Sequence, residues 1–427
     1  MKTVFADGKA EVELIEAMRG RSAEIDKGVT EAVKTIIDDV RLRGDDAVRE
    51  YTEKFDGVRL ESFEIEKSEI EKAYNEVPRD VIAAFERAAE NIRDYHQRQK
   101  RESFLVTKDY GVVMGQRVRG LALAGLYVPG GKAAYPSSVL MNAIPAKVAG
   151  VGELVMVTPP SKMGVNPAIL AAAKIAGIDR VISVGGAQAV AALAYGTQCI
   201  PKVDKIVGPG NVYVAAAKRL VFGTVDIDMI AGPSEILIIA DETANPTYLA
   251  ADLMSQAEHD PMASAVLITT SEIIAKETLK ELEIQLKTLS RNDIINESLK
   301  NFGAAIICRD IAECVKLANE IAPEHLELMV ANPMQLLGSI DNAGSVFLGQ
   351  YSPEPLGDYF AGPNHVLPTS GTARFFSPLS VDTFVKKSSF IYYTKEALAK
   401  GREDIVKLAQ TEGLTAHANS IEVRFKN

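Results

Sequence analysis

The chain has 427 residues, of which 47% are hydrophobic, so it can form roughly two or three domains of about 150 residues each. Its formal charge of -10 disfavours nucleic acid as a partner, because phosphate binding depends on a basic surface. Three cysteines are too few for a disulfide framework or a thiolate metal site. We see no signal-peptide core and no apolar run of the roughly 18 residues that a membrane span needs, and therefore expect a cytoplasmic protein with no membrane partner.

The first part of the chain is helical and charged. Residues 27–106 have apolar side chains at helical spacing, most clearly in 29–40. His96 belongs to the last of these helices. We assign it a structural role, because a lone histidine is more often hydrogen-bonded than functional.

Beyond these helices, short apolar strands alternate with helices. A first series of strands is predicted at 121–127, 153–158, 180–184, 205–207 and 227–230. A second series is predicted at 236–240, 265–270, 304–308 and 345–348. Strand, helix and strand at this spacing indicate parallel pairing. The sequence therefore predicts an α/β fold of two units with related layout, which allows a repeat by duplication, and a small separate piece after about residue 380.

Glycine-rich turns follow three strands of the first series, at 127–131, 184–188 and 207–211. In open α/β sheets ligands bind at the carboxyl ends of strands, and glycine lets backbone N–H groups approach a phosphate. The full G-x-G-x-x-G pattern is missing, and the proline of Gly208-Pro209-Gly210 removes one N–H donor. Dinucleotide binding and plain tight turns both remain open at this stage.

The histidines give the best indication of chemistry. Four of the five lie after residue 258, each near a carboxylate or an amide: His259, His325, His365 and His417. Imidazole paired with carboxylate is used for metal ligation and for proton transfer near neutral pH. Each histidine alone could be a hydrogen-bonded structural residue. Four of them in polar settings favour a single site.

A metal site is the first hypothesis for these residues. Asn245-Pro246 is a good helix start, and Gln256 and His259 lie three apart in the last turn, so their side chains can meet on one face. The alternative for Gln256 is an ordinary helix-end amide. Further ligands suited to zinc or a similar divalent ion could come from Asp358 together with His417 or His365.

Glu324-His325 is the candidate acid/base pair. Neighbouring side chains after Pro323 could serve two different proton transfers in one cleft. The alternative is an exposed loop pair. No covalent route competes with this hypothesis, because the turn that holds Ser234 lacks the nucleophile-elbow pattern.

At these residues the chain resembles a known family. The segments DMIAGPSE at 228–235 and ADLMSQAEH at 251–259 resemble the signature of histidinol dehydrogenase. The similarity continues through PEHLE at 323–327, GPNH at 362–365 and EGLTAH at 412–417, and it covers the three glycine-rich turns. The resemblance therefore spans nearly the whole chain.

The resemblance implies an oxidoreductase that converts L-histidinol into L-histidine, through the aldehyde, in two successive NAD-dependent steps that close histidine biosynthesis. It implies zinc bound by Gln256, His259, Asp358 and His417. It implies that His325 is the base and that Glu324 activates water. The substrate-binding residues that it implies are Ser234, Gln256, His259, His325, Asp358, His365, Glu412 and His417. The residues that it implies for NAD are Tyr127, Gln188 and Asn211.

The resemblance also implies the domain plan. We expect two incomplete Rossmann-like α/β domains plus small N- and C-terminal extensions. The expected boundaries are 1–20 for the N-terminal extension, 21–124 with 236–379 for the metal and catalytic domain, 125–235 for the NAD domain and 380–427 for the C-terminal extension. The family forms homodimers with a shared active site, so Glu412 and His417 would act in the partner's site.

Two other functions remain as alternatives. The chain could be a zinc-dependent NAD dehydrogenase of the same fold that acts on another small alcohol. It could also be a metal-binding protein without catalysis. The pair Glu324-His325 beside loops of the NAD-binding type argues against the second alternative.

Overall fold

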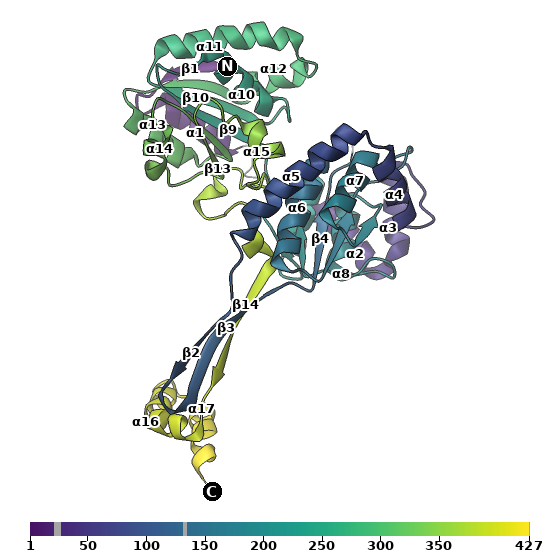
Figure 1. Ribbon diagram of the computed structural model, residues 1–427, viewed down its shortest axis with the longest axis vertical. Coiled ribbons are helices and arrows are strands. Elements are labelled where there is room, and N and C mark those ends of the chain that lie inside the picture. Colours follow the sequence, from purple (N-terminus) through teal and green to yellow (C-terminus); the bar gives the residue numbers. More distant parts are fainter. Residues whose placement is uncertain (21–26, 131–134, 427) are drawn as a thin grey trace.

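Two α/β units and a long stalk make up the protein (Figure 1). The computed structural model describes residues 1–20, 27–130 and 135–426, so Gly131 of the turn expected at 127–131 lies outside the described residues. The stalk leaves the α/β units and ends in the C-terminal helices, far from both sheets. Within the described residues, no helix is both long and apolar enough to cross a membrane.

The first unit is built on a six-stranded parallel sheet. Its strands, in spatial order, are β1 (Lys2–Phe5), β11 (Gly303–Ile307), β10 (Ser264–Thr269), β9 (Glu235–Ala240), β12 (His325–Met329) and β13 (Ser345–Leu348). Its helices are α1 (Ala10–Gly20), α10 (Pro246–Ala257), α11 (Glu272–Gln285), α12 (Asn292–Phe302), α13 (Ile311–Ile321), α14 (Pro333–Leu336) and α15 (Glu354–Tyr359). The central strands β9 and β10 are buried along their whole length, as expected for a sheet covered on both faces.

The second unit is built on a five-stranded parallel sheet. Its strands, in spatial order, are β6 (Arg180–Ile182), β5 (Glu153–Val157), β4 (Leu123–Tyr127), β7 (Lys205–Val207) and β8 (Asp226–Ile227). The connecting helices are α6 (Pro136–Ala149), α7 (Pro167–Ala176), α8 (Gly186–Tyr195) and α9 (Val212–Val221). Helix α8 is almost entirely buried, which explains its Ala-rich sequence.

Both sheets have the same strand order. We number the strands of the first unit from β9 and those of the second unit from β4, in chain order. Each sheet then has the spatial order 3-2-1-4-5. The first sheet has β1 as an additional edge strand. This is the order of a Rossmann sheet that lacks its sixth strand. The structure therefore confirms the predicted α/β fold with two incomplete Rossmann-like units.

The packing of the N-terminal helices corrects the expected domain boundaries. Helices α2 (Lys27–Arg43), α3 (Asp45–Asp56), α4 (Lys67–Glu76) and α5 (Arg79–Gln97) pack on the second unit, not on the first. The reason is that their apolar stripes complete the cores around the five-stranded sheet: Val33 joins Val190, and Ile92 joins Leu126. Residues 1–20 are also no separate extension, because β1 pairs with β11.

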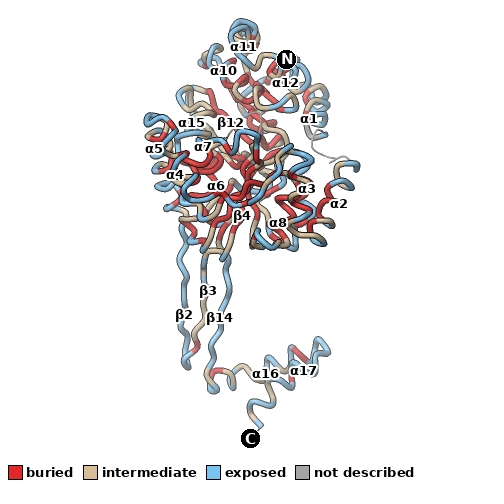
Figure 2. Tube along the Cα trace, turned by 90° about the vertical axis from the view of Figure 1, so that its right-hand side faces the viewer, coloured by how far each residue is buried: buried red, intermediate tan, exposed pale blue. Residues whose placement is uncertain are grey.

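Three antiparallel strands form the stalk, an element that the sequence analysis missed. They are β2 (Phe104–Lys108), β3 (Val112–Gly120) and β14 (Val385–Tyr392), and they carry α16 (Lys395–Thr411) and α17 (Thr415–Glu422). Figure 2 shows these strands exposed or only partly covered along most of their length. A sheet with no buried face lacks the alternating apolar pattern by which strands are recognised.

Candidate active site

Helix α10 positions the first two predicted ligands. The Asn245 side chain caps the helix by accepting a hydrogen bond from the Thr247 N–H, and Pro246 occupies the first turn. The helix ends at Ala257, so only Gln256 lies in its last turn. His259 lies two residues beyond the end, where its N–H donates to the Gln256 carbonyl at 3.2 Å. This corrects the prediction that both residues belong to the helix.

Glu324 and His325 are not an exposed loop pair, the alternative that the sequence left open. His325 is the first residue of the buried strand β12, and the two residues are only 7% and 4% exposed. The Glu324 carboxylate accepts a hydrogen bond from the Glu235 N–H at 2.9 Å, and His325 Nδ1 lies 3.0 Å from the Glu235 carbonyl oxygen. Because a carbonyl oxygen only accepts, Nδ1 carries a proton, and Nε2 is the atom left for proton exchange.

Two carboxylates face His325 Nε2, Asp358 at 3.9 Å and Glu354 at 4.0 Å. Burial lowers the pKa of His325, but the Glu324, Asp358 and Glu354 carboxylates outweigh burial and raise it to about 10. Burial raises the pKa of Glu324 to about 7. A cation bound by Asp358 and Glu354 would neutralise part of the negative charge beside His325 and so bring the pKa of His325 back toward neutrality.

A cluster suited to a metal ion lies beside this pair. The side-chain nitrogens or oxygens of His259, Glu354 and Asp358 all lie within 4.8 Å of one another. Burial lowers the pKa of His259 and so favours the neutral imidazole that binds metals. Burial opposes ionisation of Asp358, but the neighbouring His325 and His365 hold the pKa of its carboxyl well below its usual range. One neutral imidazole and two carboxylates are ligands that zinc accepts.

Buried polar atoms without partners support this fit. In the described part of the chain, Gln256 Oε1, Glu354 Oε1 and His325 Nε2 have no hydrogen-bond partner. A buried polar atom left unpaired is destabilising by about 1–3 kcal/mol. The Ser255 hydroxyl donates to Glu354 at 3.1 Å, and Gln256 is the next residue in the chain. The unpaired atoms of Gln256 and Glu354 therefore lie in the same part of the structure. The residues present therefore fit a divalent cation.

Glu354 is the functional candidate that the sequence analysis missed. It is 2% exposed, and its backbone N–H donates to the Glu327 carboxylate at 2.8 Å. Burial, reinforced by the Asp358 carboxylate, raises the pKa of Glu354 to about 8. A signal was present in the sequence: Glu354 lies four residues before Asp358 in a short helix that follows Pro353, which puts both carboxylates on one face.

His365 connects the cluster to the second α/β unit. Its Nδ1 lies 3.8 Å from Asp358 Oδ1 and 3.0 Å from the Asp358 carbonyl oxygen. Its Nε2 lies 3.3 Å from the hydroxyl of Ser138 in α6. Ser234 lies half-buried directly before Glu235, at the start of β9. The cluster therefore lies where the two units meet, with His365 next to the Asp358 carboxylate.

Glu412 and His417 are not brought to the cluster within one chain. Both are exposed, the first just after α16 and the second in α17, at the far end of the stalk (Figure 1). The fifth histidine is structural, as expected: His96 is fully buried, with Nδ1 2.7 Å from the Ile92 carbonyl oxygen.

Backbones approach closely at the predicted cofactor loops of the second unit. Gly208 has φ +109, and a Cβ added there would lie 2.2 Å from the Tyr127 carbonyl oxygen. A Cβ on Gly185 would lie 2.3 Å from Pro159, in the loop after β5. The buried ion pair of Lys218 with Asp228 holds the Gly208 turn, since each side chain also bonds the Gly208 backbone. Space requires glycine at both positions, and at Gly208 the positive φ requires it as well.

The three predicted NAD residues differ in their surroundings. The Tyr127 hydroxyl accepts the Gly186 N–H at 3.0 Å, and burial raises the pKa of Tyr127 to about 12. Gln188 is 1% exposed, and neither polar atom of its amide has a partner among the described residues. Asn211 caps α9 by accepting from the Tyr213 and Val214 N–H groups. Tyr127 and Asn211 therefore make hydrogen bonds that hold the fold, whereas the Gln188 amide makes none among the described residues.

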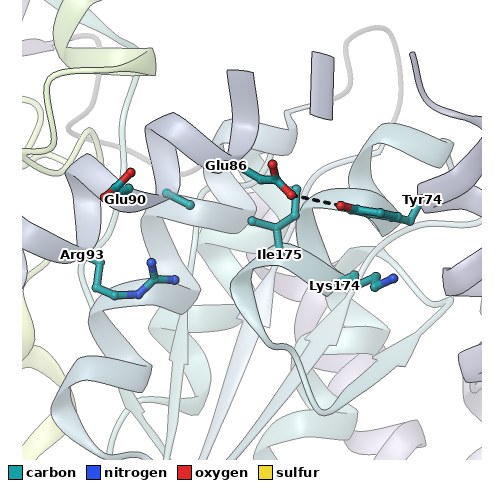
Figure 3. Close-up of a pocket in the computed structure, with 7 residues that line it drawn as sticks. Tyr74, Glu86, Glu90, Arg93, Lys174 and Ile175 are labelled. Atoms are coloured by element: carbon teal, nitrogen blue, oxygen red, sulfur yellow. Dashed lines mark hydrogen bonds between the residues drawn. The ribbon is translucent and has the colours of Figure 1, made fainter. Parts of the chain in front are cut away.

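A surface hollow of about 420 Å³ between α4, α5 and α7 lies apart from these residues (Figure 3). Two of its polar side chains are paired: the Tyr74 hydroxyl donates to Glu86 at 3.0 Å, and Lys174 pairs with Glu71 of α4 at 2.5 Å. The hollow contains none of the residues of the imidazole and carboxylate cluster.

The geometry defines a two-unit α/β enzyme with a buried imidazole and carboxylate cluster at the junction of its units. Residues 19–425 match the family model described as histidinol dehydrogenase. Over 425 residues the chain is 58% identical to the histidinol dehydrogenase of Clostridium acetobutylicum, covering 99% of each protein. It is 57% identical to that of Listeria innocua over 426 residues, covering 100% of this chain and 99% of the relative.

A solved structure agrees with these sequence relatives. The crystal structure of histidinol dehydrogenase from Elizabethkingia anophelis superposes with a TM-score of 0.93 at 40% identity, covering 99% of this chain and 98% of the other. The chain belongs to the histidinol dehydrogenase family and is therefore an oxidoreductase.

Proposed function

We propose that the protein oxidises L-histidinol to L-histidine through L-histidinal, in two NAD-dependent steps in the cytoplasm, as the last reaction of histidine biosynthesis. The observation that carries this proposal is the buried pair Glu324 and His325 beside the cluster of His259 and Asp358, in a chain of this family. Two different proton-transfer groups at one cation site match an alcohol oxidation followed by attack of water on the aldehyde.

Proton transfer in the first oxidation falls to His325. Its Nδ1 is fixed by the Glu235 carbonyl oxygen, so Nε2 is the atom that would take the proton of the substrate hydroxyl. Glu324, whose pKa burial raises to about 7, then removes a proton from the water that attacks the aldehyde. When bound, NAD would accept two hydrides, one from the carbon that carries the hydroxyl and one from the hydrated aldehyde, and the hydrate would release two protons to become the carboxylate. Each histidinol thus yields two NADH.

Zinc would be held by Gln256, His259, Asp358 and the His417 of a second subunit. Bound there, it would supply a fixed positive centre that orients the imidazole and amino group of the substrate. We place Ser234, His365 and Glu412 at the walls of the substrate pocket. The exposure of Glu412 and His417 at the end of the stalk fits a homodimer in which they complete the partner's site.

NAD would bind at the carboxyl edge of the five-stranded sheet. Tyr127 ends β4, and the turns after β6 and β7 lie beside it. The unpartnered amide of Gln188 could bond the cofactor directly. Asn211 would act mainly by presenting the start of α9, since its side chain caps that helix.

The test is the stoichiometry of the reaction. Purified protein should form two NADH, measured by absorbance, and one histidine, measured by amino-acid analysis, for each histidinol consumed. The matched preparation of His325→Ala excludes contaminating dehydrogenases. Release of histidinal after a single NADH would contradict the proposal. Faster turnover of another small alcohol would keep the reaction type and change the substrate.

A further inference from the structure

Asp56 is a partly buried acid that the reaction proposed above does not use. It is the last residue of α3, and Gly57, with its left-handed backbone, ends the helix directly after it. The Oδ2 atom of Asp56 is buried and has no hydrogen-bond partner among the described residues. An unpaired buried carboxylate oxygen is costly, so it calls for a partner from outside the chain.

The carboxylate lies at the carboxyl edge of the five-stranded sheet, where we place NAD. Burial raises the pKa of Tyr127 and the Asp56 charge raises it further, so the carboxylate lies close to that hydroxyl. The next residue, Gly57, lies beside the loop after β5, because a Cβ added to it would be 4.0 Å from Lys162 Cε. That loop also packs against the glycine-rich turns of this unit. Asp56 is therefore within the surroundings of the proposed cofactor.

The loop after β5 lacks the charge that NAD recognition needs. In dinucleotide-binding units of this fold, an acidic residue bonds the 2′-hydroxyl of the adenosine ribose of NAD, whereas a cation accommodates the 2′-phosphate of NADP. The loop, residues 158–166, has no acidic residue, and its one charged residue is the exposed Lys162. By itself this loop would favour NADP. Asp56 supplies from α3 the negative charge that the loop lacks.

We propose that Asp56 binds the adenosine ribose hydroxyls of NAD and so determines the preference for NAD over NADP. The inference rests on the cofactor site of the proposed function and names the group that gives this site its specificity. A carboxylate accepts strong hydrogen bonds from ribose hydroxyls, and the same charge repels a 2′-phosphate. Lys162 is the cation that can pair with that phosphate once the Asp56 charge is removed.

Binding of the reduced dinucleotides, without histidinol, tests the proposal. Fluorescence anisotropy of NADH and of NADPH gives their dissociation constants for the full-length protein. Asp56→Asn should bind NADH about tenfold more weakly than wild type, because a hydrogen bond to a charged group is lost. It should bind NADPH more tightly, because the repulsion of the 2′-phosphate is lost. An unchanged ratio of the two dissociation constants would overturn the proposal.

Two further variants separate the local contact from the general charge. Glu53→Gln removes the same charge one turn earlier on α3, where Glu53 is exposed, and should leave the ratio unchanged. Adding Lys162→Ala to Asp56→Asn should cancel the gain in NADPH affinity. If Glu53→Gln changes the ratio as much as Asp56→Asn does, the role of Asp56 is overturned. A gain that survives without Lys162 would overturn the pairing of Lys162 with the phosphate.

A change of ligand covers the case in which Asp56→Asn does not fold. NADH that lacks the 2′-hydroxyl of its adenosine ribose should bind the wild-type protein about tenfold more weakly than NADH. Equal affinities would overturn the proposal. If neither NADH nor NADPH binds, the inference fails together with the cofactor site on which it rests. NADH binding with the expected specificity, but no NADH formation from histidinol, would refute the proposed reaction alone.

Discussion

The two α/β units share one strand order but carry their polar groups at opposite edges of their sheets. In the five-stranded unit, Tyr127 ends β4 and Gly208 follows β7, so the loops lie at the carboxyl edge where ligands of such sheets bind. In the six-stranded unit, Glu235 and His325 begin β9 and β12, so the cluster lies at the amino edge. The two units therefore share a strand order, but among the described residues the polar cluster of the six-stranded unit has no counterpart at the same edge of the five-stranded sheet.

The two edges also differ in the kind of group they use. The carboxyl edge of the five-stranded sheet consists of backbone turns that glycine brings into contact. The amino edge of the six-stranded sheet consists of buried imidazoles and carboxylates, and in the described residues His325 Nε2 and Glu354 Oε1 have no hydrogen-bond partner. Backbone turns can bind a cofactor, but proton transfer and metal ligation need titratable side chains. The comparison predicts that variants at the two edges fail in different ways.

The largest effect should come from the amino edge. His325→Ala should lower turnover by about 10² to 10⁴ and keep its metal, because it removes the proton acceptor and no ligand. His259→Ala and Asp358→Ala should lose metal and activity together. Metal analysis of the purified variants, alongside NADH formation, is the measurement. A His325→Ala protein without metal would reassign that residue as a ligand.

Subunit mixing tests whether the amino edge is complete in one chain. His417→Ala and His259→Ala should each be inactive alone. If their ligands come from different chains, each mixed dimer has one intact site. Random exchange should then restore activity to about a quarter of the sites. Co-refolding followed by an activity assay measures this. If subunit exchange is proven and no activity returns, the shared site is excluded.

At the carboxyl edge, the decisive substitution is Gly208→Ala. The added Cβ would meet the Tyr127 carbonyl oxygen, so the variant should lose NAD binding and about 1–3 kcal/mol of unfolding free energy while keeping its metal. Gly223→Ala is the matched control, because Gly223 also has positive φ but nothing within 4 Å of the added carbon. Thermal unfolding and NAD titration compare the two. If both variants lose the same unfolding free energy, the loss comes from the positive φ and not from the contact with the Tyr127 carbonyl oxygen.

The smallest effect should come from Asp56 at the end of α3 in the five-stranded unit. Its Oδ2 is buried without a partner in the described chain, and burial raises the pKa of Asp56 to about 6. The folded state therefore binds the proton more tightly than the unfolded state, so stability falls as pH rises from about 4 through 6. Since Asp56 is only half-buried, the loss should be about 1 kcal/mol.

The variant Asp56→Asn removes this titration. It should be more stable than wild type above pH 6, and the difference should vanish below pH 4. Denaturant unfolding of both proteins across that range is the measurement. A difference that does not change with pH would show that Asp56 does not titrate between these values.

Much of the fold could be predicted from the sequence because it depends on local patterns. Most strands of both βα series were found within a few residues, since buried parallel strands are continuous apolar runs. The edge strand β1 and the strand β12 were not predicted; in β12 the apolar run HLELM is interrupted by Glu327. The cap at Asn245-Pro246 predicted the start of α10 correctly. The stalk was missed because its strands are exposed, and the packing of α2 to α5 was misassigned because an apolar stripe does not say which sheet it covers.

For the site, the sequence by itself determined the residue types: histidines next to carboxylates, in motifs that resemble one family. It could not determine which of them meet. Only the tertiary structure placed Glu354 with His259 and Asp358, buried His325 at the start of β12 and left His417 at the end of the stalk. The physical reason is that a motif fixes chemistry over a few residues, whereas convergence across about 100 residues depends on sheet register and helix packing, which no local pattern encodes.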